Sequence, residues 1–204
     1  MKVLRITLLA DGSSDRVLVR VIEWVLAELK VAAIVQWADL RTLPTPPTGL
    51  ANRALKALDL YPAEILVVHR DAERESLAGR VDEMAAALAG LSVKRVCVVP
   101  VRMTEAWFLF DERAIREAAN NPNGTEPLDL PDLAEVEGIP DPKETLKEAL
   151  RRASGHHGHR LAKFDTGKAF HRLADRVGAF APLRRLAAFT RFEAEARRVC
   201  AELS

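Results

Sequence analysis

The sequence predicts an α/β fold, namely a mostly parallel sheet covered by helices on both faces, with a C-terminal helical annex. Strand-like and helix-like patterns alternate through residues 1–101, and the strand-like segments are continuously apolar. Continuous apolar runs are typical of parallel strands that are buried on both faces. After residue 101 the pattern becomes helical. We therefore predict an α/β domain over residues 1–119 and, packed on it, an acidic loop with a basic helical annex over residues 120–204.

Four apolar, β-branched segments in the first part are predicted to be strands. They are Val3–Ala10, Val31–Ala38, Ile65–His69 and Val93–Val101. The helix after the first strand has apolar residues at helical spacing from Val17 to Leu29, and Ser13 or Ser14 is suited to cap its amino end. Two further helices are expected at Leu50–Leu60 and Leu77–Leu91.

The second part is predicted to be helical around one long loop. Met103–Ala119 has a helical pattern, and an acidic, proline-containing stretch then reaches Pro142, which suits the first turn of a helix. A loop of this length is uncommon in a compact domain unless it is functional or mobile. The remaining helices are expected at Lys143–Ala153, Thr166–Val177 and Pro182–Leu203.

Composition excludes several classes of protein. Apolar residues make up 49% of the 204 residues, which is enough for a core. No apolar run approaches the roughly 18 residues of a membrane span. The apolar segment at the amino terminus is too short, and acidic residues follow it too early, for a signal peptide. The two cysteines, Cys97 and Cys200, favour neither a disulfide framework nor a zinc site. These features predict a cytoplasmic globular protein with no membrane partner.

Charge is distributed unevenly along the chain. Residues 1–103 carry 14 basic and 12 acidic side chains, residues 104–142 carry 2 and 10, and residues 143–204 carry 14 and 7. A basic final third suits a polyanion such as DNA or RNA, although solvated arginines on a helical pair would give the same balance. The residues expected to contact a nucleic acid are Arg70, Arg151, Arg152, Arg160, Lys163 and Lys168.

Acidic residues follow two of the predicted strands. Asp11 and Asp15 come after the first strand, and Asp71 and Glu73 come after the third. Parallel α/β sheets bind ligands beyond the carboxyl ends of their strands, so neighbouring strands would bring these four carboxylates together. Hard oxygen ligands in that number suit Mg²⁺ or Mn²⁺, which would also relieve their mutual repulsion. The alternative for Asp11 and Asp15 is stabilisation of a helix amino end.

These residues resemble a known fold. Asp11-Gly12-Ser13-Ser14-Asp15 after a first strand, with Asp71-Ala72-Glu73 after a later one, is similar to the Toprim fold of topoisomerases, primases and overcoming-lysogenization-defect nucleases. The segment Met103–Leu109 resembles an uncharacterised Toprim-like bacterial family often found near ATPase genes in defence loci. This second resemblance covers most of the chain. Asp11 stands where Toprim enzymes generally have Glu, and Glu73 stands where they have Asp.

The resemblance implies a Mg²⁺- or Mn²⁺-dependent nuclease or nickase, acting in phage defence with an ATPase partner. Asp11 and Glu105 would be catalytic, and Asp11, Asp15, Asp71 and Glu73 would hold the metal. Alternatively, Glu105 is an ordinary acid in the first turn of a helix that Thr104 caps. The alternative function is a non-catalytic Toprim-like module that assembles with and regulates an ATPase, which the two departures favour. A second copy of the chain is a further candidate partner.

Other residues have simpler explanations. Trp107 is expected in the core, and His69 is expected to be a buried histidine with satisfied hydrogen bonds. The segment Gly155–Arg160 either contacts phosphates or is an exposed basic loop, and its histidines lack zinc-ligand spacing. No Walker-type phosphate loop, GxGxxG turn or G-x-S-x-G elbow is present, so the chain is not expected to bind ATP or to be a serine hydrolase.

Overall fold

The computed structural model describes residues 3–203, and its centre is a parallel sheet of four strands. The strands are β1 (Leu4–Leu9), β2 (Ala33–Trp37), β3 (Ile65–His69) and β4 (Lys94–Val98). Their order across the sheet is β2-β1-β3-β4, and every neighbouring pair is parallel. The predicted α/β fold with a parallel sheet is therefore confirmed. Because β1 and β3 are neighbours, the loops that follow them leave the sheet side by side.

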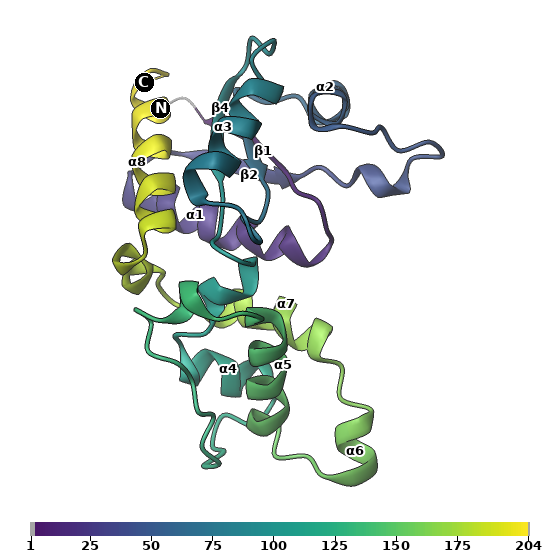
Figure 1. The fold of residues 1–204 in the computed structure, drawn as a ribbon, viewed down its shortest axis with the longest axis vertical. Helices are drawn as coiled ribbons and strands as arrows, with labels where there is room; N and C mark the ends of the chain where they lie inside the picture. Colours follow the sequence, from purple (N-terminus) through teal and green to yellow (C-terminus); the bar gives the residue numbers. More distant parts are fainter. Residues whose placement is uncertain (1–2, 204) are drawn as a thin grey trace.

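Helices cover both faces of this sheet (Figure 1). The helices α1 (Leu18–Glu28) and α8 (Ala187–Ala201) pack on the face that carries Ile6, Val67 and Val98. The helices α2 (Leu50–Leu60) and α3 (Leu77–Ala87) pack on the other face, which carries Leu66 and Val68. Each of these strands therefore sends successive apolar side chains into two different cores, which explains its continuous apolar sequence.

The remaining helices form a lobe beyond the carboxyl edge of the sheet (Figure 1). They are α4 (Glu112–Ala118), α5 (Pro142–Ala153), α6 (Gly158–Ala162) and α7 (Thr166–Arg176). The last helix of the chain, α8, leaves this lobe and returns to the sheet beside β4. There Glu195 Oε2 accepts a hydrogen bond of 3.1 Å from the backbone N–H of Cys97. The helical annex is thus divided between the lobe and the cover of the sheet.

One aromatic core joins the lobe to the sheet. Trp107 is fully buried, as expected, and its ring centroid lies 5.3 Å from that of Phe189 on α8. Phe108 is also fully buried, and its ring lies edge-on to Phe170 of α7 at 5.1 Å. These residues belong to the same core as the α1 face of the sheet. The short 3-10 helix Thr104–Phe108 therefore connects the two halves of the molecule.

Two helices predicted from the sequence are interrupted. Instead of one helix over Met103–Ala119, a 3-10 helix over Thr104–Phe108 precedes α4. The carboxylate of Asp111 accepts a 2.9 Å hydrogen bond from the N–H of Ala114, so α4 starts afresh there. The expected Pro182–Leu203 helix is likewise split, because Leu186 is extended between a 3-10 helix at Ala181–Arg185 and α8.

Pro142 lies in the first turn of α5, as predicted, and Asp141 caps that turn by accepting from the N–H of Glu144 at 2.9 Å. The long acidic loop before it contains one short 3-10 helix, Val136–Gly138. Leu128, Leu133 and Val136 are buried, so this loop is packed against the core.

Within residues 3–203, no helix combines the length and the apolar character needed to cross a membrane.

Candidate functional site

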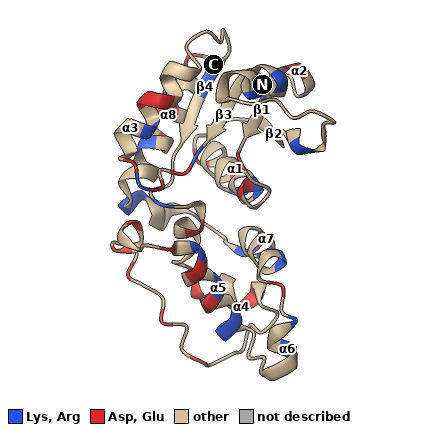
Figure 2. Cartoon of the chain, turned by 45° about the vertical axis from the view of Figure 1, so that its right-hand side comes forward, with Lys and Arg blue, Asp and Glu red and all other residues tan. Residues whose placement is uncertain are grey.

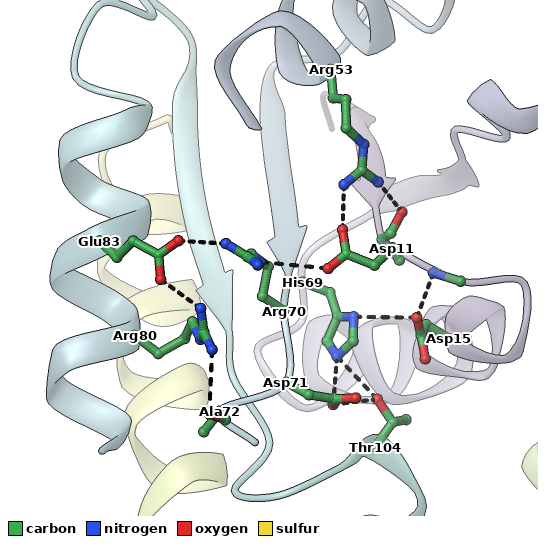
Figure 3. A network of polar contacts seen from close by, with 12 residues as sticks. Asp11, Asp15, Arg53, His69, Arg70, Asp71, Ala72, Arg80, Glu83 and Thr104 are labelled. Atoms are coloured by element: carbon green, nitrogen blue, oxygen red, sulfur yellow. Dashed lines mark hydrogen bonds and ion pairs between the residues drawn. The ribbon is translucent and has the colours of Figure 1, made fainter. Parts of the chain in front are cut away.

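The loops after β1, β3 and β4 meet at the carboxyl edge of the sheet and bring acidic residues together (Figure 3). Asp15 lies in the 3-10 helix after β1, Asp71 comes two residues after β3, and Glu105 lies in the 3-10 helix after β4. This placement follows from parallel pairing of β1 with β3 and of β3 with β4. Three of the four predicted acids, Asp11, Asp15 and Asp71, are joined here by Glu105 from the segment after β4.

His69, the last residue of β3, lies at the centre of this edge. Its side chain is only 1% exposed, with Nδ1 3.6 Å from Asp15 Oδ2 and Nε2 3.2 Å from Asp71 Oδ1. Burial by itself lowers the pKa of His69, but the hydrogen bond to Asp71 and the charges of Asp71, Asp15 and Asp11 outweigh it and raise that pKa. The carboxylates on either side of the ring favour its protonated form, and His69 links the first and third loops.

Thr104 supports the same arrangement from the fourth strand. Its hydroxyl donates to Asp71 Oδ1 at 3.2 Å and lies 3.0 Å from His69 Nε2. The expectation that Thr104 caps the following helix was wrong, because Met103 occupies the cap position and the Thr104 hydroxyl is used by Asp71. Ser13 and Ser14 also cap no helix; instead, Asp15 Oδ2 accepts a 2.8 Å hydrogen bond from the N–H of Gly12.

Asp11 is neutralised by two arginines. Arg53 of α2 forms an ion pair with Asp11 Oδ1 and also donates to the carbonyl oxygen of Ala10 at 2.6 Å. Arg70 Nε lies 3.5 Å from Asp11 Oδ2, and the same guanidinium pairs with Glu83 on α3. Arg70, predicted to contact nucleic acid, thus already has two acidic partners within the chain.

Glu105 is the most buried of the acids, since its side chain is 8% exposed. Burial raises the pKa of Glu105, and the charges of Asp71 and Asp15 raise it further, while Lys143 lowers it. Lys143 of α5 is the nearest cation, with Nζ 4.0 Å from Glu105 Oε1. A carboxyl group in this environment retains its proton at higher pH than an exposed glutamate does.

Glu73 lies apart from the other acids. Its backbone is left-handed, with a φ of 54°, and its N–H donates to the carbonyl oxygen of Arg102 at 3.1 Å. The side chain is exposed, and within residues 3–203 no hydrogen bond or ion pair joins it to Asp11, Asp15 or Asp71. The turn after Ala72 thus separates Asp71 from Glu73, although the sequence pattern favoured a shared ion.

The donor chemistry of this edge fits a hard dication, because Asp11, Asp15, Asp71 and Glu105 offer carboxylate oxygens and Thr104 offers a hydroxyl. The positions of these oxygens fit a metal ion less well than their chemistry does. Among residues 3–203, no three acids, histidines or cysteines are already grouped as a metal site. Protein cations occupy the space between the acids, with His69 between Asp15 and Asp71 and two arginines on Asp11. Binding of Mg²⁺ would therefore have to displace these contacts.

Three of the predicted basic residues of the annex pair with nearby acids. Arg151 pairs with Glu144 at 2.8 Å, Arg152 pairs with Asp129, and Lys168 lies 3.5 Å from Asp165. Figure 2 shows basic and acidic residues interspersed along the ribbon of α5. Arg160 and Lys163 line an open cavity of about 450 Å³ beside α6, and Lys168 lines it too.

Several residues of the site were not predicted. From the sequence, Thr104 was expected only as a helix cap and Lys143 only as a helix residue, and no role was expected for Arg53. Arg53 lies on α2, far along the chain from Asp11, so no spacing rule connects the two. His69 was expected to be buried with satisfied hydrogen bonds; it is buried and its Nε2 is hydrogen-bonded, but among residues 3–203 its Nδ1 has no hydrogen-bond partner. Its position two residues before Asp71 was the one available signal for its role.

Comparison with known proteins adds no relative, since neither a family model, nor a curated protein, nor a solved structure matches this chain.

Proposed function

We propose that this chain is a Toprim-like protein that cleaves or nicks nucleic acid with Mg²⁺ or Mn²⁺, as the effector of a defence system with an ATPase partner. One observation carries the proposal: Asp11, Asp15, Asp71 and Glu105 converge from three strand ends onto one edge of a parallel sheet. Carboxylates gathered at such an edge repel one another and favour a bound cation. The resemblance of Asp11–Asp15 and Asp71–Glu73 to the Toprim acids supports the same function.

Each residue has a distinct role in this proposal. Asp15 and Asp71 would hold the metal, which when bound polarises a phosphodiester and stabilises the leaving oxygen. Asp11, whose side chain is 46% exposed, is the accessible carboxylate and would accept a proton from the attacking water. Burial raises the pKa of Glu105, which favours its protonated form relative to an exposed glutamate, and its carboxyl group would donate a proton to the leaving oxygen. Lys143 lies beside it and favours the carboxylate that remains.

Cleavage of labelled DNA and RNA tests this function. Purified protein should nick supercoiled plasmid, or cut single-stranded or double-stranded oligonucleotides, with millimolar Mg²⁺ or Mn²⁺ and not with chelator. Asp71→Asn keeps the shape and an oxygen but loses the charge that attracts a dication, so it should abolish cleavage. Asp82→Asn is the matched control, since Asp82 is exposed on α3 away from the edge. Equal activity in both variants would overturn the assignment.

A second function is favoured by a different observation. The acids are already compensated by Arg53, Arg70 and His69, as expected for a non-catalytic module that assembles with an ATPase. In that case neither Mg²⁺ nor Mn²⁺ should raise the melting temperature, because an ion that binds only the folded state stabilises it by mass action. A rise in melting temperature in the wild type that is lost in Asp71→Asn would favour the nuclease.

A further inference from the structure

Three cavities follow one another along the carboxyl edge of the sheet, because neighbouring cavities share lining residues. Trp37 and Arg41 line both a small cavity of about 100 Å³ beside Asp11 and a larger one of about 680 Å³. Ser13 and His171 line the larger cavity and a third one of about 290 Å³, which reaches Glu105. We call this run of cavities the edge groove. It leads from one acid of the candidate site past an aromatic ring to another acid.

Trp37 is the aromatic surface of the edge groove, and two arginines lie over its ring. The guanidinium carbon of Arg41 is 5.1 Å from the ring centroid, and that of Arg16 is 5.8 Å from it. Asp39 fixes Arg41 through two hydrogen bonds of 2.8 Å, so one face of the ring has a permanent neighbour. The indole Nε1–H is buried and, in the part of the chain that the structure describes, has no hydrogen-bond partner.

Arg16 has no such anchor. It is exposed, lines the large cavity, and forms no ion pair with any acid within residues 3–203. The other arginines of this cavity are engaged, Arg20 with Glu23 and Asp175 and Arg41 with Asp39. Arg16 is therefore a cation held near an aromatic ring without a counter-ion, and it can move off the ring at little cost when a ligand arrives.

We propose that the edge groove binds a single strand of DNA or RNA, with a base stacked on Trp37 and the adjoining phosphate bound by Arg16. This rests on the proposed function and names its substrate as single-stranded. Trp37 is half-buried, and an accessible aromatic ring beside cations is typical of single-strand binding, because unpaired bases present a free face for stacking. An elongated run of cavities suits an extended polymer better than a compact ligand. The strand would pass directly beside Asp11, where the backbone would meet the acids.

Binding in the absence of metal tests this groove separately from cleavage. We expect a fluorescein-labelled oligothymidine of about 12 nucleotides, in EDTA, to increase in anisotropy on binding. Trp37→Leu should weaken binding roughly tenfold because the stacking surface is lost, whereas Trp37→Phe should retain most of it. Arg16→Gln should weaken binding and lower the slope of log affinity against log salt by about 0.7, as expected for one lost phosphate contact. Since Arg16 is exposed, that variant remains informative if Trp37→Leu does not fold.

Arg5→Gln is the matched control, because Arg5 is exposed near the amino end of β1, at the opposite edge of the sheet. It should bind as the wild type does. The groove is overturned if both Trp37→Leu and Arg16→Gln bind like this control, if a duplex of the same length competes as well as the single strand, or if thymidine monophosphate competes equally. Metal-free binding that depends on Trp37, without cleavage in Mg²⁺ or Mn²⁺, would support the groove and refute the nuclease. Cleavage that is unchanged in Trp37→Leu would support the nuclease and refute the groove.

Discussion

The carboxyl edge has buried charged side chains that contact several others, whereas the annex has exposed charged side chains that form separate pairs. At the edge, His69 is 1% exposed and Asp15 10% exposed, and each charged group faces several others. In the annex, Arg152 and Asp129 are 38% and 70% exposed and form one local pair. Buried charges interact strongly and cost much to isolate, whereas exposed pairs are screened and contribute little. The annex has the larger net charge, but charged groups affect stability more at the carboxyl edge.

The largest expected effect is at His69. His69→Leu would leave Asp15 and Asp71 facing each other without their shared cation, which for a buried pair costs about 3 kcal/mol of unfolding free energy. Urea unfolding followed by circular dichroism measures this. A loss below about 1 kcal/mol would mean that the edge is as well solvated as the annex, and the contrast between the two regions would fail.

The same residue predicts a pH dependence. The folded-state pKa of His69 is raised, so its stabilising contribution is complete below the unfolded-state value near 6.5 and is lost as pH rises through the folded value. The unfolding free energy of the wild type should therefore fall as pH rises above about 6.5. The control is His69→Leu, in which this fall should be absent. An identical pH profile in the two proteins would contradict the assignment.

A smaller loss is expected for Asp71→Asn. The side chain is 26% exposed and keeps an oxygen for Thr104, but it loses the charge that compensates His69. We expect a decrease of about 1–2 kcal/mol in metal-free protein, typical of a lost charged hydrogen bond. Thermal unfolding with chelator measures it. Stabilisation instead would mean that repulsion between the acids outweighs the contact with His69.

Glu105→Gln should act in the opposite direction. Burial raises the pKa of Glu105, so ionisation of this carboxyl group is less favourable in the folded than in the unfolded chain, and a neutral side chain of similar shape removes that penalty. The melting temperature at pH 7 should rise by roughly 2–4 °C, and the difference from wild type should shrink as pH falls below the range of the folded pKa. A lower melting temperature at pH 7 would show that the contact with Lys143 outweighs burial.

The smallest effect is expected in the annex. Arg152→Gln removes an exposed pair with Asp129, and such pairs contribute about 0–1 kcal/mol. Its unfolding free energy should stay within about 0.5 kcal/mol of the wild-type value. A loss as large as that of His69→Leu would remove the distinction between the two regions.

The sequence predicted the sheet well because its signal is local. The central strand β3 is buried at every residue, and β1 is buried at all but Arg5, so burial on both faces is recorded in their continuous apolar runs. The helix after β4 was predicted less well. Asp111 caps a new helix instead of continuing the preceding one, and the spacing of apolar residues does not show which of the two a given aspartate will do.

The candidate site was predicted only where strand ends define it. Asp15 and Asp71 follow their strands closely, so parallel pairing was enough to bring them to one edge. The cations beside the other two acids, Arg53 of α2 on Asp11 and Lys143 of α5 near Glu105, arrive through tertiary packing and have no fixed spacing from those acids. Glu73 is exposed because the backbone at that residue is left-handed, which a sequence pattern does not reveal for a glutamate.

The return of α8 to the sheet has a consequence for synthesis on the ribosome. This helix follows all four strands in the chain, yet it covers the part of one sheet face nearest β4 and supplies Glu195 to the outer edge of that strand. Until it emerges, a nascent chain would expose apolar side chains and an unpaired amide at an edge strand. Such surfaces promote pairing between chains. Vectorial folding of this protein therefore has a vulnerable interval, which closes only when α8 has cleared the exit tunnel.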